Sequence, residues 1–145
     1  MKCYLDTSAL AKWYVWEPGS EAFEDFIRSL DEDAAIISPL TITEMRSLLA
    51  RRRRMRELEK AHEQQAWQTF LRDIASGALN VMPLRDQTFM RAVDLLEQLP
   101  DCALRTLDAL HLALADQANV NALASGDRIM LRAARLLGLQ THAFH

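Results

Sequence analysis

Four carboxylates in this 145-residue sequence have the chemistry to act together: Asp6, Glu44, Asp108 and Asp127. Two carboxylates about 5 Å apart at an effective dielectric constant near 20 repel by roughly 3 kcal/mol, so a cluster of them is strained without a cation. Mg²⁺ and Mn²⁺ are hard ions that prefer oxygen ligands. A bound divalent ion can convert a water to hydroxide and neutralise charge on a phosphoryl oxygen. The four acids therefore point to metal-assisted chemistry at a phosphate group.

Asp6 and Asp127 each stand where a predicted strand passes into a predicted helix. The carboxyl ends of parallel strands meet at one edge of a sheet, and ligands of open α/β sheets bind there. We therefore expect these two side chains at the same edge. Asp is also a favoured residue at helix N-termini, so capping alone would explain either position, and that alternative stays open.

Asp108 lies in the most apolar helical stretch of the sequence, predicted over residues 104–118 and far from either end. Burying an unpaired carboxylate costs several kcal/mol, so something must compensate it. A metal ion would do so, and so would Arg105, three residues earlier on the same helix. Glu44 has a local alternative as well, because Thr41-x-x-Glu44 fits a capping box.

The elements that must position these acids alternate along the chain. Strands are predicted over residues 2–5, 34–38, 79–84, 121–125 and 139–144, and helices over residues 7–15, 21–30, 41–56, 57–75, 85–99, 104–118 and 127–137. Strands that alternate with helices favour a parallel sheet covered on both faces. We expect a single α/β domain over residues 1–145.

Four short stretches carry the four acids. They read Asp-Thr-Ser-Ala-Leu at 6–10, Leu-Thr-Ile-Thr-Glu-Met at 40–45, Leu-Asp-Ala-Leu-His-Leu-Ala at 107–113 and Ser-Gly-Asp-Arg at 125–128. In order and spacing they resemble the four acidic motifs of PIN-domain ribonucleases, and the likeness covers the whole chain. The length, the single domain and the third motif are most similar to the VapC toxins of bacterial toxin–antitoxin pairs.

The resemblance implies a PIN-like three-layer α/β/α fold with a mainly parallel central sheet of about four to five strands. It also implies that Asp6, Glu44, Asp108 and Asp127 ring a Mg²⁺ site, which Mn²⁺ can also fill, where a metal-bound water attacks an RNA phosphodiester. Asp6 and Asp108 would be the firmest ligands, and Glu44 and Asp127 would act through water or as the base that orients the nucleophile. Substrate contacts are expected from Thr7, Ser8, Ser125, Arg51 and Arg105. Helix capping explains Thr7 and Ser8 equally well.

The same resemblance implies a VapB-like antitoxin as an inhibitory partner and a homodimer. Trp13 and Trp16 share a face of the first predicted helix, and a core stripe is the first interpretation. An apolar groove for a partner peptide is the alternative. His111 lies near Asp108 in helical projection, the other three histidines show no ligand spacing with one another, and none of the four is expected to be catalytic.

The densest positive cluster comprises Arg46, Arg51–Arg54 and Arg56. The chain as a whole has 17 Lys and Arg against 20 Asp and Glu, a net charge of −3, so its overall field does not attract RNA and any such affinity must be local. A solvated helix end would explain the cluster. Arg51, however, falls on the helical face of Glu44, where it could grip a phosphate chain that enters the acidic site.

Several classes of protein are excluded or disfavoured. Strictly apolar runs never exceed four residues, whereas a membrane span needs about 20, so we expect a soluble cytoplasmic protein without membrane contact. Cys3 and Cys102 lack metal-site spacing and are expected as reduced core residues. The four glycines are scattered, so neither a P-loop nor a dinucleotide motif can be drawn.

Two other functions compete with a nuclease. A phosphotransfer enzyme on a similar sheet is disfavoured, because Ser8 stands where a haloacid-type phosphatase would have Asp. A receiver domain would need paired acids after the first strand and a Lys near the last, but Lys occurs only at positions 2, 12 and 60. A non-catalytic RNA- or protein-binding module that retains the PIN fold stays open.

Overall fold

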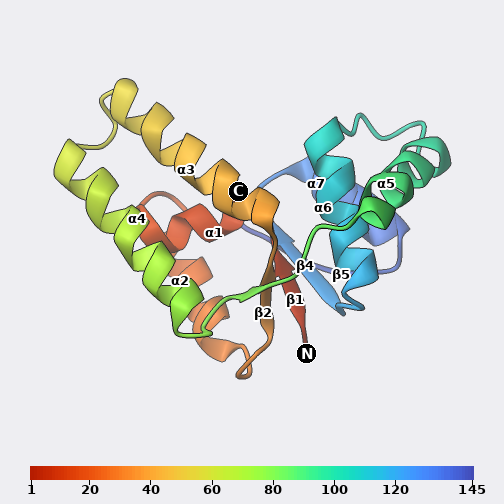
Figure 1. The fold of residues 1–145 in the computed structure, drawn as a ribbon, viewed down its shortest axis with the longest axis horizontal. Coiled ribbons are helices and arrows are strands. Elements are labelled where there is room, and N and C mark those ends of the chain that lie inside the picture. Colours follow the sequence, from red (N-terminus) through yellow and green to blue (C-terminus); the bar gives the residue numbers. More distant parts are fainter.

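The computed structural model describes all of residues 1–145 as a central sheet of five parallel strands between two layers of helices (Figure 1). The strands are β1 (Cys3–Leu5), β2 (Ala35–Ile37), β3 (Asn80–Val81), β4 (Ala122–Ser125) and β5 (Gln140–Ala143). The helices are α1 (Thr7–Tyr14), α2 (Ser20–Ser29), α3 (Pro39–Arg54), α4 (Lys60–Ala75), α5 (Asp86–Gln98), α6 (Thr106–Gln117) and α7 (Arg128–Leu136). The predicted three-layer α/β/α fold is confirmed.

Alternate side chains of the central strand β1 pack into two separate hydrophobic cores. Cys3 and Leu5 belong to the core packed beneath α1 to α4, whereas Tyr4 belongs to the core beneath α5 to α7. Figure 1 shows these two groups of helices on opposite sides of the sheet. All residues of β1, β2 and β4 are buried, as expected for parallel strands covered on both faces.

The strand order β3-β2-β1-β4-β5 determines where the sheet can bind a ligand. From β1 the chain builds β2 and β3 on one side and later adds β4 and β5 on the other. The order therefore reverses between β1 and β4, and a crevice forms at such a point outside the carboxyl ends of the strands. Leu5 is in register with Ala124, so Asp6, directly after β1, lies beside Ser125, the last residue of β4.

For two helices, α3 and α6, the observed start changes the interpretation of an acid. Helix α3 begins at Pro39, because Ser38 is its N-cap and forms the capping box with Thr41, and Pro suits the first helical position. Helix α6 begins at Thr106, because the backbone of Arg105 is extended. The capping-box interpretation of Glu44 is therefore wrong, and the expectation that Asp108 lies far from a helix end is also wrong.

Helix α1 is shorter than predicted, which separates the two tryptophans. The helix ends at Tyr14 and Val15 is already extended, so Trp16 lies beyond the helix and is 72% exposed. Trp13 packs against the core. The core-stripe interpretation is correct for Trp13 and wrong for Trp16.

Part of the arginine cluster holds α3 against α4. The buried carboxylate of Glu63 accepts hydrogen bonds from Arg46 Nη2 at 2.6 Å and pairs with Arg53 Nε at 2.8 Å. Arg52 pairs with Glu17. Arg51 forms no ion pair and is exposed. Three of the six clustered arginines are thus committed to the fold, and Arg51 is free to bind a ligand.

Two further findings concern the cysteines and the length of the helices. Cys3 and Cys102 are buried and unbridged in different cores, as predicted for reduced thiols. No helix combines the length and the apolar character that crossing a bilayer requires.

Replacing both Arg46 and Arg53 with Met leaves the buried Glu63 carboxylate without a cation. Removing one partner of a buried ion pair costs about 3 to 5 kcal/mol. We expect the lower end of that range, a fall of about 3 kcal/mol in the free energy of unfolding, because both arginine side chains are partly exposed and water can reach the carboxylate. Urea titration at neutral pH measures the change. The exposed Arg54 forms no ion pair, so Arg54→Met should change stability by less than about 0.5 kcal/mol. An equal effect of both changes would contradict the role given to Glu63.

Candidate active site

A cleft of about 450 Å³ at the carboxyl edge of the sheet contains all four predicted acids. Its lining residues are Asp6, Thr7, Ser8, Glu44, Ser47, Leu48, Arg51, Arg105, Leu107, Asp108 and Asp127. Every residue predicted for the site lines it except Ser125, which is fully buried beneath Asp6. The crevice expected from the strand order is therefore acidic.

Asp6 is held through one carboxylate oxygen. Ser8 Oγ donates to Oδ2 at 2.9 Å and Ser125 Oγ donates to the same atom at 2.7 Å. The two hydroxyls in turn accept the backbone N–H groups of Gly126 at 2.8 Å and Asp127 at 2.9 Å. Asp6 precedes α1 but makes no side-chain capping bond, so capping does not explain it. Its Oδ1 accepts no hydrogen bond from the protein.

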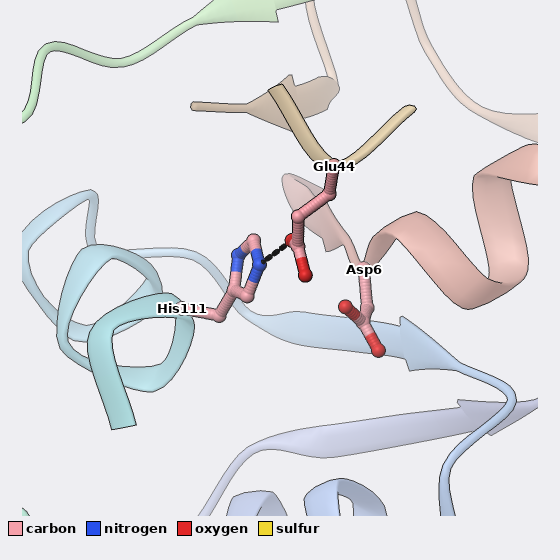
Figure 2. Close-up of side chains that lie close together, drawn as sticks. All are labelled: Asp6, Glu44 and His111. Carbon is pink, nitrogen blue, oxygen red and sulfur yellow. Dashed lines mark hydrogen bonds and ion pairs between the residues drawn. The ribbon is translucent and has the colours of Figure 1, made fainter. Parts of the chain in front are cut away.

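Glu44 is likewise held through one of its two carboxylate oxygens. Thr7 Oγ1 donates to Oε1 at 3.0 Å, and His111 Nε2 also contacts Oε1. Figure 2 shows the carboxylate between the imidazole and Asp6, with its second oxygen turned away from the ring. Asp6, Glu44 and His111 each offer a ligand atom, and these atoms lie within 4.8 Å of one another.

Asp108 and Asp127 are held by backbone N–H groups. Asp108 is half-buried in the first turn of α6, and its Oδ2 accepts the N–H of Arg105 at 3.1 Å. Arg105 thus compensates Asp108 through its backbone, and its guanidinium forms no ion pair with the carboxylate. Asp127 Oδ1 accepts the N–H groups of Ile129 at 2.8 Å and Met130 at 3.2 Å, which confirms the capping interpretation for Asp127.

Each of the four carboxylates therefore accepts hydrogen bonds through one oxygen and leaves its other oxygen without a protein partner. The oxygens that accept no hydrogen bond from the protein are Asp6 Oδ1, Glu44 Oε2, Asp108 Oδ1 and Asp127 Oδ2. None of these four oxygens is fully buried, because His142 Nε2 is the only fully buried side-chain nitrogen or oxygen without a partner. No Lys or Arg forms an ion pair with any of the four acids. The four acids thus offer oxygen donors with no paired Lys or Arg, a set that fits a hard divalent ion.

The electrostatics of the innermost three groups agree with this arrangement. Burial raises the pKa of Asp6, and His111 and the two serine hydroxyls offset that effect only in part. Burial would also raise the pKa of Glu44, but the hydrogen bond and the charge of His111 lower it. Burial would lower the pKa of His111, but the hydrogen bond to Glu44 and the neighbouring carboxylates raise it. A cation beside Asp6 would offset the desolvation of its ionised form.

His111 is the site residue that the sequence analysis missed. It is 1% exposed and lies on α6, with Nδ1 2.6 Å from the hydroxyl of Tyr4 and Nε2 against Glu44. Its spacing of three residues from Asp108 puts both on one face of the helix, and this was the available signal.

The family assignment agrees with the fold and the acidic cleft. The sequence profile of the PIN domain family matches residues 3–136. This chain belongs to the PIN-domain family. Ribonuclease VapC47 of Mycobacterium tuberculosis (strain CDC 1551 / Oshkosh) is 30% identical over 143 residues, which cover 95% of this PIN domain and 93% of that protein. The predicted likeness to VapC-type members is confirmed.

Solved structures share the fold of this PIN domain at low sequence identity. The sarcin-ricin loop cleaving toxin VapC20 of Mycobacterium tuberculosis gives a TM-score of 0.73 at 16% identity, covering 91% of this chain and 95% of that one. FitAcB from Neisseria gonorrhoeae gives 0.72 at 16% identity, covering 96% and 95%. VapBC2 from Rickettsia felis, bound to a promoter DNA fragment, gives 0.71 at 15% identity, covering all of both chains.

Asp6→Asn is expected to stabilise the metal-free PIN domain at neutral pH. Because burial raises the pKa of Asp6, its ionised form costs folding free energy above the folded-state pKa, and that cost is absent where the carboxyl is protonated in both states. The Tm advantage of the variant should be largest near about pH 8 and vanish near about pH 3, below the ordinary pKa of Asp.

Calorimetric scans in EDTA measure this difference, and Asp25→Asn on the exposed surface of α2 is the matched control. Asp25→Asn should show no such dependence on pH. A variant Asp6→Asn that is less stable than the parent at about pH 8 would contradict the electrostatic account.

Proposed function

We propose that this PIN domain is a metal-dependent endoribonuclease and the toxin of a toxin–antitoxin pair. The observation that carries the proposal is the acidic cleft, in which four carboxylates each present an oxygen that no protein group binds. The similarity to a protein named Ribonuclease VapC47 supports RNA as the substrate.

The roles proposed for the four acids follow the likeness to PIN-domain ribonucleases. Asp6 and Asp108 would be the firmest ligands of Mg²⁺ or Mn²⁺. When bound, the ion supplies an activated water and neutralises charge on the phosphoryl oxygen. Glu44 and Asp127 would act through water or orient the nucleophile. Ser125 is fully buried, so its hydroxyl would serve by fixing Asp6.

The hydroxyls at the start of α1 hold Asp6 and Glu44, whose ligand atoms lie within 4.8 Å of each other. Ser8 fixes Asp6 and Thr7 fixes Glu44, each by donating to a single carboxylate oxygen. We expect the two residues to influence cleavage mainly through these acids. Direct contact with RNA remains a prediction for both.

Arg51 and Arg105 are the groups that would hold the RNA backbone. Both are exposed at the cleft, on α3 and just before α6 respectively. Neither forms an ion pair with an acid of the protein, so both guanidinium groups can bind phosphate oxygens without breaking an internal contact. Phosphate contacts position a strand without reading its bases, so these arginines give no sequence specificity by themselves.

An antitoxin is the proposed protein partner. A second cleft of about 550 Å³ runs between the end of α1 and α4, and the exposed Trp16 lines it together with Trp13 and Leu58. Large aromatic side chains of this kind suit an apolar segment of an inhibitor. Structural neighbours that are toxin–antitoxin complexes, such as one from Klebsiella pneumoniae, support the same partner. A homodimer stays a prediction, which sedimentation velocity on the antitoxin-free protein measures.

Purified protein freed of antitoxin should cleave RNA with Mg²⁺ or Mn²⁺ and stop in EDTA. Asp6→Asn and Asp108→Asn should each lower the rate by more than about 100-fold, because loss of an outer partner of a metal ligand already costs about 10- to 100-fold. Circular dichroism checks that both variants are folded, and Asp25→Asn should cleave like the parent. Metal-independent cleavage would reject the proposal, and metal-independent RNA binding without cleavage would favour a non-catalytic module.

Arg51→Gln should weaken the binding of single-stranded RNA with little effect on cleavage of bound substrate. Loss of one phosphate contact should reduce the slope of log K against log salt by about 0.7. Filter binding by a cleavage-inactive Asp108→Asn background over a salt series measures the slope. Arg28→Gln on α2 is the control, because Arg28 lines a different cleft at the opposite edge of the sheet. Equal slopes for the two arginine variants would contradict a phosphate contact at Arg51.

A further inference from the structure

His111 is the one imidazole among the carboxylates of the cleft, and both of its nitrogens are engaged. Nδ1 lies 2.6 Å from the hydroxyl of Tyr4, and Nε2 contacts Glu44 Oε1 (Figure 2). A ring that is 1% exposed could be replaced by an apolar side chain if it served packing alone. Its two specific polar partners argue for a role beyond packing, because a buried polar group is costly unless it is satisfied.

The contact with Glu44 is selective for one oxygen. Thr7 Oγ1 donates to Oε1 at 3.0 Å, and His111 Nε2 meets the same atom, while Oε2 accepts nothing from the protein. A glutamate side chain is flexible and loses rotamer freedom when it is fixed. Two partners on one oxygen restrict the carboxylate and leave the other oxygen facing the side of Asp6 (Figure 2).

The imidazole is itself held from the other side. The Tyr4 hydroxyl donates to Ser38 Oγ at 2.9 Å, and Tyr4 and Ser38 are both fully buried. Ser38 is the N-cap of α3, the helix that carries Glu44. The contacts therefore run from the start of α3 through β1 and α6 and return to Glu44, so the position of His111 is determined by three elements of the fold.

We propose that His111, held by Tyr4, is a positioning residue that fixes Glu44 so that its free oxygen faces the cation. The inference rests on the proposed function of the cleft. His111 is not a metal ligand in this assignment, because its Nε2 is turned to Glu44 Oε1. Second partners of this kind orient the ligands of metal sites, and their loss weakens metal affinity or activity by about 10- to 100-fold.

A double-mutant cycle with Mn²⁺ as the probe tests the proposal. His111→Phe should weaken Mn²⁺ binding, measured by titration calorimetry, by about 10-fold in the parent protein. In a Glu44→Ala background the same change should have less than about a 2-fold effect, since the group through which it acts is gone. An equal loss in both backgrounds would mean that His111 only supports the structure, and it would overturn the proposal.

Three further variants keep the test decisive. Tyr4→Phe retains the ring and removes the hydroxyl, and it should show the same dependence on Glu44, so it replaces His111→Phe in the cycle if that variant does not fold. His111→Gln keeps an amide donor and should recover part of the affinity. His145→Gln at the exposed end of the chain should bind Mn²⁺ like the parent.

Spectroscopy and the cleavage assay separate this proposal from the proposed function. Pulsed electron paramagnetic resonance of the Mn²⁺ complex should show no directly bound nitrogen, and a nitrogen coupling that His111→Phe abolishes would make His111 a ligand and overturn the positioning role. Absence of RNA cleavage together with the predicted Mn²⁺ cycle would reject the nuclease and retain the positioning role. RNA cleavage together with an equal loss of Mn²⁺ affinity in both backgrounds would retain the nuclease and reject the positioning role. Absence of Mn²⁺ binding would reject both.

Discussion

The acidic cleft at the carboxyl edge of the sheet concentrates negative charge that no Lys or Arg of the chain neutralises. The rest of the site is built around this constraint. Four carboxylates share one cleft, and hydroxyls, backbone N–H groups and an imidazole hold each of them by one oxygen. Burial already raises the pKa of Asp6 before any other acid is considered. Such an arrangement lowers the stability of the free protein, as active sites commonly do, and the proposed divalent cation would offset that cost.

The sheet explains why acids so far apart in sequence converge. β1 lies at the centre, and the chain leaves it first toward β2 and β3 and later returns on the other side as β4 and β5. Asp6 and Asp127 follow the strands on either side of the point where the order reverses, and the backbone N–H of Asp6 donates to Ala124 O at 2.9 Å. Helices α3 and α6 bring Glu44 and Asp108 to the same crevice from the two opposite layers (Figure 1). A small all-parallel sheet can thus gather four acids without a long loop.

The fold and the strand-end acids followed from local signals, whereas the way the acids are held did not. Alternating apolar runs and amphipathic stretches were enough to predict the sheet and the position of Asp6. The place of Asp108 depended on a start of α6 two residues later than predicted, because helix boundaries are the least certain feature of a sequence pattern. His111 was missed because its partners are 107 and 67 residues distant in the chain, and no periodicity reports such contacts.

The central claim concerns a cation in the acidic cleft, and a crystal structure of the purified protein in Mn²⁺ tests it most directly. Anomalous scattering locates manganese without assumptions about the reaction. The account predicts a peak among the free oxygens of Asp6, Glu44, Asp108 and Asp127, with Glu44 Oε1 still bonded to His111. Crystals grown in millimolar Mn²⁺ with no anomalous peak in this cleft, or with manganese only elsewhere on the surface, would contradict it.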